Sequence, residues 1–155
     1  MKRLAIVLMS ALVLAASVQA ATPPLGLRAG YTSWEGLNQF HFGAHARMGD
    51  LFPNLAFTPN LEIGTGDNLT VIAVNGDLAY RVTELSSAPW GPYVGGSLGL
   101  IYAKPHGFDG NADLGLSALV GTSYAMDNGH ELLLEVRLGI LDSPGFKATI
   151  GYTFF

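Results

Sequence analysis

The last ten residues of the chain, 146–155, constrain its fold most strongly, because apolar side chains alternate there with polar or small ones. Side chains in a β-strand point to opposite faces in turn, so this segment predicts a strand with one wholly apolar face. The apolar face carries Phe146, Ala148, Ile150, Tyr152 and Phe154, and the other face carries Lys147, Thr149, Gly151 and Thr153. A closed barrel whose outer face meets lipid explains such a strand better than a soluble domain does.

The same alternation recurs in seven earlier segments. Charged residues make up only 13% of the 155 residues, about half the usual share, and the mean hydropathy is positive, at +0.32. Yet no stretch after residue 20 approaches the roughly 20 apolar residues that a membrane helix needs. Hydropathy spread over alternating segments is typical of transmembrane strands. The expected strands are Leu25–Ser33, Asn38–Met48, Leu55–Gly64, Leu69–Val82, Tyr93–Tyr102, Leu114–Tyr124, Glu131–Gly139 and Phe146–Phe155.

In these features the chain resembles the small bacterial outer-membrane β-barrel proteins (OmpA/OmpX/OmpW-like), whose last strand alternates apolar residues and ends in an aromatic residue, typically Phe. The resemblance implies an all-β fold, an eight-stranded antiparallel up-and-down transmembrane β-barrel in the cell outer membrane. It also implies that Tyr152, Phe154 and Phe155 form the assembly signal read by the barrel-assembly machinery. The family usually aligns its terminal Phe with the apolar face, whereas here Phe154 is in phase and Phe155 lies one step beyond.

The N-terminal segment predicts export. Lys2 and Arg3 precede an apolar run at 4–18, and the small residues of Val18-Gln19-Ala20 match a signal-peptidase site. An uncleaved membrane anchor fits less well, because the run is too short and wrongly flanked. We therefore expect a signal peptide at 1–20, cleaved after Ala20, and a barrel domain at 21–155. The intact mass of the exported protein tests this cleavage.

The direction of the two faces decides between a membrane barrel and a soluble, lipocalin-like barrel. A solvated face would be crowded with Lys and Glu, but the polar face is mostly Gly, Ser and Thr with isolated charges. The apolar face carries the large side chains, which an eight-stranded interior could hardly hold. The small, polar face is therefore expected to line the lumen, and the apolar face to meet outer-membrane lipid.

The polar face also collects most of the basic residues. Five cations and four acids nearly balance on it, as buried charges must, although their pairing depends on the strand registers. The expected lumen network is Arg28, His41, His45, Arg47, Glu62, Asp77, Arg81, Glu131, Glu135, Arg137 and Lys147, together with Asn60 and Asn75. Eight strands enclose a space that side chains can just fill, so we expect a blocked lumen and not a general porin. Inward glycines at 95, 99, 115, 121 and 139 leave a narrow channel for small solutes as the alternative.

Two patterns suggest metal sites and neither holds. His41 and His45 lie on one face, but four residues of strand separate them by about 13 Å, too far to share an ion. The segment 109–113 resembles the start of a calcium loop, yet Leu114 and Val120 stand where the glycine and the bidentate glutamate are needed. We expect an Asp- and Asn-rich turn there, with no metal and no cofactor.

Enzyme activity is not expected either. Some eight-stranded outer-membrane barrels modify lipid A, and the deacylases among them carry a His-x-Ser pair with a glutamate. No histidine of this chain is followed two residues later by serine. Without a nucleophile and base we assign no catalytic residue. An envelope-structural or surface-interaction role is the expected function, and the lipid A-modifying enzyme is the alternative.

Charge and aromatic placement indicate the partners. Removing Lys2 and Arg3 leaves six basic residues against twelve acidic ones, a net charge of −6, so nucleic acid is excluded as a partner. Tyr80, Tyr124 and Phe154 end even-numbered strands on the apolar face, which predicts an aromatic girdle at the periplasmic level. Lipid and the barrel-assembly machinery are the expected partners of a monomer.

The connections between the expected strands are rich in Gly, Pro, Asn and Asp, as turns are. The segment 103–113 is the longest of those expected to face outside, and 49–54 is expected to be a simple connection. Pro59 lies inside the third expected strand, where a closed barrel has no free edge to tolerate a missing N–H. A bulge or a late strand start would accommodate it.

Overall fold

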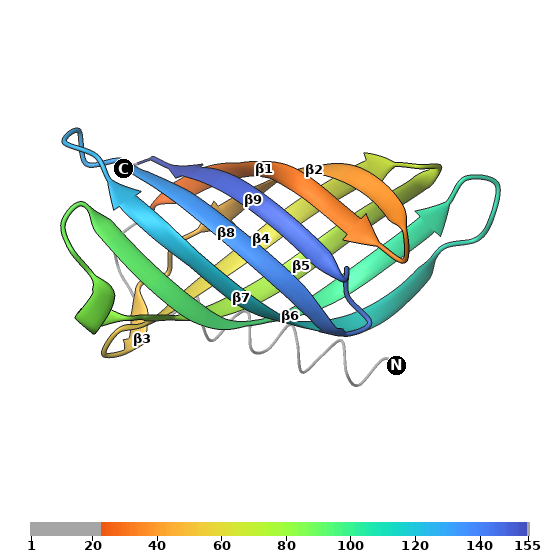
Figure 1. Ribbon diagram of the computed structural model, residues 1–155. Helices are drawn as coiled ribbons and strands as arrows, with labels where there is room; N and C mark the ends of the chain where they lie inside the picture. The colour runs from red at the N-terminus through yellow and green to blue at the C-terminus, as the bar shows by residue number, and fades with distance from the viewer. Residues whose placement is uncertain (1–22, 155) are drawn as a thin grey trace.

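The computed structural model describes residues 23–154, so the expected signal peptide, the cleavage site after Ala20, and Phe155 lie outside the described residues. The described chain is almost entirely β-structure (Figure 1). None of its helical segments is long and apolar enough to cross a membrane. The elements are β1 (Leu25–Trp34), β2 (Leu37–Ala46), β3 (Asp50–Phe52), β4 (Leu55–Gly66), β5 (Leu69–Arg81), the short 3₁₀ helix η1 (Thr83–Leu85), β6 (Trp90–Pro105), β7 (Asn111–Ala125), β8 (Glu131–Leu141) and β9 (Phe146–Thr153).

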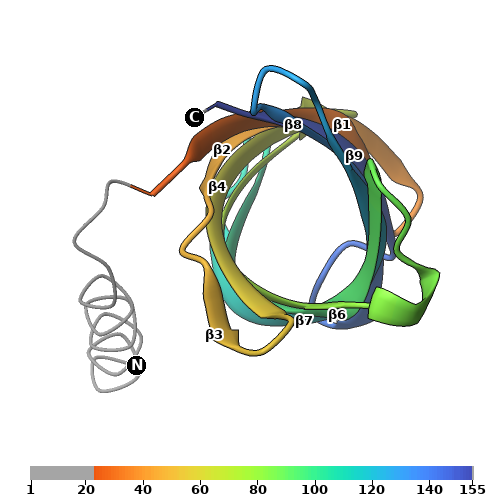
Figure 2. The same ribbon diagram turned by 90° about the vertical axis from the view of Figure 1, so that its left-hand side faces the viewer.

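Eight of the nine strands within residues 23–154 close into a barrel, seen along its axis in Figure 2. Each pairs with its neighbours in antiparallel fashion, and β2 pairs directly with β4. The ring closes between β1 and β9, from Gly26 opposite Thr153 to Ser33 opposite Phe146. Closure leaves no free edge in the barrel wall. The predicted eight-stranded antiparallel up-and-down barrel is confirmed.

The two ends of the barrel are named here from the chain. The terminal end is where β1 begins and β9 ends, and the distal end is the opposite one. Because neighbouring strands are antiparallel, β5 and β7 also finish at the terminal end. The connections at 35–36, 67–68, 106–110 and 142–145 therefore lie at the distal end.

β3 is an addition to the barrel that the sequence did not predict. Asp50 pairs with Ala56 and Phe52 with Leu55, so the expected connection at 49–54 is instead a small hairpin. Asn54 adopts a φ of 66° at its turn, a left-handed conformation that asparagine tolerates. In Figure 2, β3 lies beside the ring at the terminal end.

β6 and β7 are longer than predicted, and their connection is shorter. The expected connection at 103–113 shrinks to 106–110. Ala103 lies opposite Asn111, so the expected turn continues as paired strand, and the Asn111 amide donates to Asp113 at 2.7 Å. The expectation of a turn at Asn111 and beyond is wrong. The polar composition suggested that the backbone there faces water, but its N–H and C=O groups bond to the neighbouring strand β6.

Pro59 is accommodated by an irregularity in the neighbouring strand. The pairing of β4 with β2 stops at Asn60. Beyond it, Met48 and Gly49 both bond to the Phe57 backbone, two residues opposing one, as in a β-bulge. The Phe57 N–H points away from β5, toward Gly49, and N–H groups two residues apart in a strand point the same way. The Pro59 nitrogen therefore faces the gap in the ladder, and the strand does not start late.

The two faces of the wall separate as predicted. Leu98 and Leu134 are 45% and 42% exposed on the outside, whereas Ser97 next to Leu98 is buried. The interior also contains apolar residues. A small cluster formed by Leu69, Val71, Ala73 and Ile101 lies toward the distal end. Polar and charged side chains fill the middle of the barrel.

Candidate functional site: a charge cluster across the barrel interior

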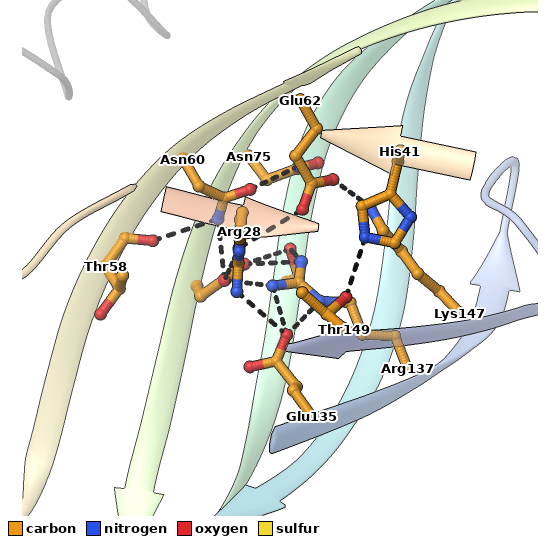
Figure 3. Close-up of polar contacts among 12 residues, drawn as sticks. Arg28, His41, Thr58, Asn60, Glu62, Asn75, Glu135, Arg137, Lys147 and Thr149 are labelled. Carbon is orange, nitrogen blue, oxygen red and sulfur yellow. Dashed lines mark hydrogen bonds and ion pairs between the residues drawn. The ribbon is translucent and has the colours of Figure 1, made fainter. Parts of the chain in front are cut away.

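Six ionisable side chains meet in the middle of the barrel and define a central charge cluster. All six are buried, because each occupies an inward position of its strand. The cluster consists of Arg28 on β1, Glu62 on β4, Asp77 on β5, Glu135 and Arg137 on β8, and Lys147 on β9. Figure 3 shows most of these side chains converging from opposite walls.

Arg137 forms the densest part of this cluster. Its guanidinium contacts both carboxylate oxygens of Asp77, with Nη1 donating to Oδ1 at 3.0 Å and Nη2 donating to Oδ2. Nε donates to Glu135 Oε1 at 2.6 Å. Ser97 donates to Asp77 at 2.6 Å and accepts from Arg137 Nη1 at 3.0 Å. A planar fork on a carboxylate is the strongest geometry available to an ion pair.

Arg28 occupies the centre, between three acids. Nη1 lies 3.5 Å from Glu62 and 3.5 Å from Asp77, and Nη2 lies 3.4 Å from Glu135. Lys147 completes the set by donating to Glu62. Three cations thus face three anions, so the cluster is neutral as a whole. Charges removed from water need this degree of pairing, since a partner left alone is costly.

Neutral polar side chains saturate the acids further. Asn60 donates to Asp77 at 2.8 Å, and Asn75 donates to Asn60 at 2.9 Å. The Tyr93 hydroxyl donates to Glu135 at 3.1 Å. Tyr93 was not singled out from the sequence. Alternation could have revealed Tyr93, because it stands two and four residues before the inward positions 95 and 97 and therefore shares their face.

The two predicted lumen histidines serve as bridges between strands. The His41 ring nitrogens lie 2.8 Å and 3.1 Å from the hydroxyl oxygens of Thr32 and Thr149. His45 Nε2 lies 2.9 Å from the hydroxyl of Thr153. Within residues 23–154, no three His, Asp or Glu side chains are grouped so as to hold a metal ion.

The other predicted network members lie closer to the terminal end. Arg47 pairs with Glu131, and both side chains are partly exposed, at 27% and 16%. Arg81 ends β5 and has no ion pair with any described residue. The predicted network is therefore divided into a buried central cluster, a rim pair and a separate arginine. Pairing across strands could not be read from the sequence. The buried Gln39, which bonds to the Leu69 carbonyl, was not singled out either, although it stands two residues before His41 and so shares its inward face.

Two cavities flank the central charge cluster. The cavity on the distal side has a volume of about 40 Å³ and is lined by Glu62, Arg137 and Lys147 as well as by Ser143 of the last distal connection. The one on the terminal side has a volume of about 70 Å³ and is lined by the Asp77 and Glu135 side of the cluster. The cluster thus lies between two small cavities.

Aromatic side chains gather on the outer surface at the terminal end. Tyr80 and Phe154 are exposed there, and Tyr124 packs edge-on against Trp90 with ring centroids 4.9 Å apart. The sequence analysis placed Trp90 in a connection between strands, whereas in the structure Trp90 is the first residue of β6. All these rings belong to the terminal end, and their role as a girdle at the periplasmic level stays a prediction.

The end of the chain is integrated into the closure of the barrel. The Phe154 N–H donates to the Leu25 carbonyl at 2.7 Å, and its ring packs 5.1 Å from that of Tyr152. The Tyr152 hydroxyl lies 2.6 Å from His130 Nδ1. Of the predicted assembly signal, Phe155 lies beyond the part of the chain that the structure describes.

A closed eight-stranded sheet with apolar side chains outside and a paired polar interior defines a transmembrane β-barrel. That is the structural class of this chain.

Comparisons with solved structures agree with this class. Neisserial surface protein A aligns with a TM-score of 0.66 and 16% identity, over 84% of this chain and 93% of that one. The N-terminal β-barrel domain of Pseudomonas aeruginosa OprF gives a TM-score of 0.54 at 13% identity, over 86% and 97%. A de novo designed transmembrane β-barrel gives 0.51 at 18%, over 88% and 98%.

No protein-family model and no curated protein sequence matches the chain. At these identities the structural similarities concern the fold alone. The resemblance to small outer-membrane barrels that the sequence indicated is confirmed at that level.

Proposed function

We propose that this chain is an integral outer-membrane β-barrel protein with an envelope-structural or surface-interaction role, whose lumen is closed by the central charge cluster. The observation that carries the proposal is the neutral set of three cations and three anions buried across the middle of the barrel. A general porin needs a wide water channel, for which the barrels of this class use sixteen or more strands.

The membrane location is supported by the outer face of the barrel. Apolar side chains such as Leu98, Val120 and Leu134 are exposed on strand after strand. In water such a continuous surface would cause aggregation, whereas in a bilayer it is satisfied by lipid. Fractionation of cells should find the protein with the outer membrane. The unheated protein should migrate differently from the heated one on a gel, as folded barrels do.

Closure of the lumen is tested by conductance. The ion pairs bridge walls that are not neighbours in the sheet, so opening a path requires separating several buried pairs at once. Purified protein in planar bilayers should give no steady nanosiemens-size openings. Steady openings of that size, abolished by unfolding the protein, would contradict the proposal.

A narrow channel for small solutes is the second candidate. It is favoured by the cavities on both sides of the cluster, the distal one of which is lined by the inward glycines at 99 and 115. The two candidates differ in one measurable property. A narrow channel would show small, frequent, ion-selective openings, whereas the closed barrel would show at most rare ones.

We do not propose an enzymatic role. The buried acids of the central charge cluster are paired with cations or with hydroxyl and amide donors, and no nucleophile stands beside a free base among them. Mass spectrometry of lipid A from cells with and without the protein should give identical profiles. A modified lipid A that depends on the protein would favour the enzyme.

A further inference from the structure

Arg81 stands apart from every other cation inside the barrel. Arg28, Arg137, Lys147 and Arg47 each have at least one carboxylate partner, but Arg81 has none within residues 23–154. Its side chain lines the cavity of about 70 Å³ on the terminal side of the central charge cluster. The inward charges of the described barrel are thus five cations against four carboxylates, and Arg81 is the cation left without an ion pair.

Two deeply buried side chains that line the same cavity each carry a nitrogen atom without a hydrogen-bond partner in the protein. His45 and Arg28 are each only 3% exposed, and both line this space. His45 Nδ1 and Arg28 Nε make no hydrogen bond to protein, whereas Arg28 Nη1 has ion-pair partners in Glu62 and Asp77, each at 3.5 Å. Buried polar groups are nearly always bonded, so donors of this kind indicate a partner that is not part of the chain.

The contact of His45 with Thr153 bears on which partner fits. When the Thr153 hydroxyl donates to Nε2, at 2.9 Å, the neutral imidazole carries its proton on Nδ1. Nδ1 is then a donor, as Arg28 Nε always is. Three carboxylates, Asp77, Glu131 and Glu135, also line the cavity, but each is already paired with Arg28, Arg47 or Arg137. The groups left without a partner are a guanidinium and further donors, which favours an anion and disfavours a cation.

The cavity is also accessible and of suitable size. A single water needs about 10–15 Å³ of such space, so about 70 Å³ accepts a small polyatomic ion. Access is from the terminal end, because the lining residues Arg47, Arg81 and Glu131 lie at strand ends and the side chains of the rim pair are partly exposed. The Thr58 and Ser123 side chains also line the space.

We propose that this cavity is a binding site for a small oxyanion, of the phosphate or carboxylate class, held mainly by Arg81 with His45 and Arg28 as further donors. A guanidinium matches the geometry of such an anion with two parallel hydrogen bonds. Binding neutralises the excess charge and satisfies the buried donors together. The site lies on one side of the central charge cluster, so it does not depend on whether the lumen conducts.

The test uses the purified, folded barrel in a non-ionic detergent that carries neither phosphate nor sulfate. Inorganic phosphate and acetate are titrated against chloride at constant ionic strength. Thermal unfolding is followed, together with the NMR signals of the His45 ring, which the H45Q variant assigns. We expect the unfolding midpoint to rise and saturate with phosphate or acetate, and the His45 signals to shift with the same affinity.

Arg81→Gln is the diagnostic variant, and Lys104→Gln is its matched control, since Lys104 is exposed at the distal end and loses the same charge. Loss of a charge-assisted bond should weaken binding in R81Q by about tenfold or more, with K104Q unchanged. Equal responses of R81Q and wild type would overturn the site. The site would also be overturned if the His45 signals of the wild type did not shift with either phosphate or acetate, because water alone would then fill the cavity. If R81Q does not fold, that wild-type titration decides.

Discussion

Arg137 and Asp77 form a two-point ion pair across the barrel interior, although β6 and β7 separate their strands in the sheet. The pair connects walls that no backbone ladder joins directly. Both side chains are buried, and Ser97 bonds to each of them. The central charge cluster therefore connects opposite walls of the barrel as well as occupying its lumen.

Removing Arg137 should destabilise and open the barrel together. The R137A variant leaves Asp77 and Glu135 with Arg28 as their only cation, at the longer distances of 3.5 Å and 3.4 Å. Breaking a buried pair by deleting one partner costs about 3–5 kcal/mol, so the free energy of unfolding in urea should fall by that order. Leak conductance in planar bilayers should rise in the same variant.

Arg47→Ala is the control for this prediction. Arg47 also pairs with a glutamate, Glu131, but the pair is partly exposed at the rim. Partly solvated pairs contribute about 0–1 kcal/mol, so R47A should change stability little and leave conductance as in the wild type. If R137A and R47A had the same unfolding free energy and the same conductance, the central charge cluster would neither stabilise the fold nor close the lumen.

Leu134→Arg tests the lipid-facing surface. Leu134 is 42% exposed on the outside of β8, and an arginine near the bilayer midplane costs about 2–4 kcal/mol. Leu85→Arg is the control, because Leu85 lies in η1 outside the strands, and exposed substitutions there cost within about 0.5 kcal/mol. Equilibrium unfolding in lipid vesicles measures both. An unchanged stability of L134R would mean that this face does not meet the bilayer core.

Gly121→Ala tests how closely the Tyr93 ring packs against the backbone of β7 at Gly121. A Cβ at Gly121 would lie 2.5 Å from the Tyr93 hydroxyl and 2.7 Å from the Leu134 carbonyl. The ring would have to move and weaken its bond to Glu135, so we expect a loss of about 1–3 kcal/mol on unfolding. At Gly96 a Cβ meets only the Ser117 carbonyl, at 3.6 Å, and G96A should be nearly neutral. Similar costs in both variants would count against this steric role.

Deletion of Phe154 and Phe155 tests the assembly signal. The truncated chain loses the bond from the Phe154 N–H to Leu25 but keeps the β1–β9 ladder up to Thr153. It should therefore still refold in detergent micelles. In cells it should remain in the periplasm and be degraded, which fractionation and immunoblotting reveal. Normal insertion of the truncated chain would refute the signal.

Much of the wall could be predicted because alternation is a local property. Ser97 and Leu98 are neighbours, and the geometry of an extended strand alone sends one inward and the other outward. The same rule directed His41, Asp77 and Arg137 to the interior. The count of eight strands and their antiparallel closure followed from repeating the pattern between short turns. Strand ends were less accurate, as Asn111 shows, because pairing with Ala103 overrode a turn-like composition.

The sequence by itself thus determined which residues face the lumen, and the tertiary structure decided which of them meet. Asp77 and Arg137 are 60 residues apart, and Arg28 and Glu135 are 107 apart. Whether two inward side chains reach each other depends on the stagger of every strand around the closed ring, and no single strand encodes that stagger. Closure therefore brought six charges to one level, left Arg81 without a carboxylate among residues 23–154, and created a cavity on each side of the central charge cluster.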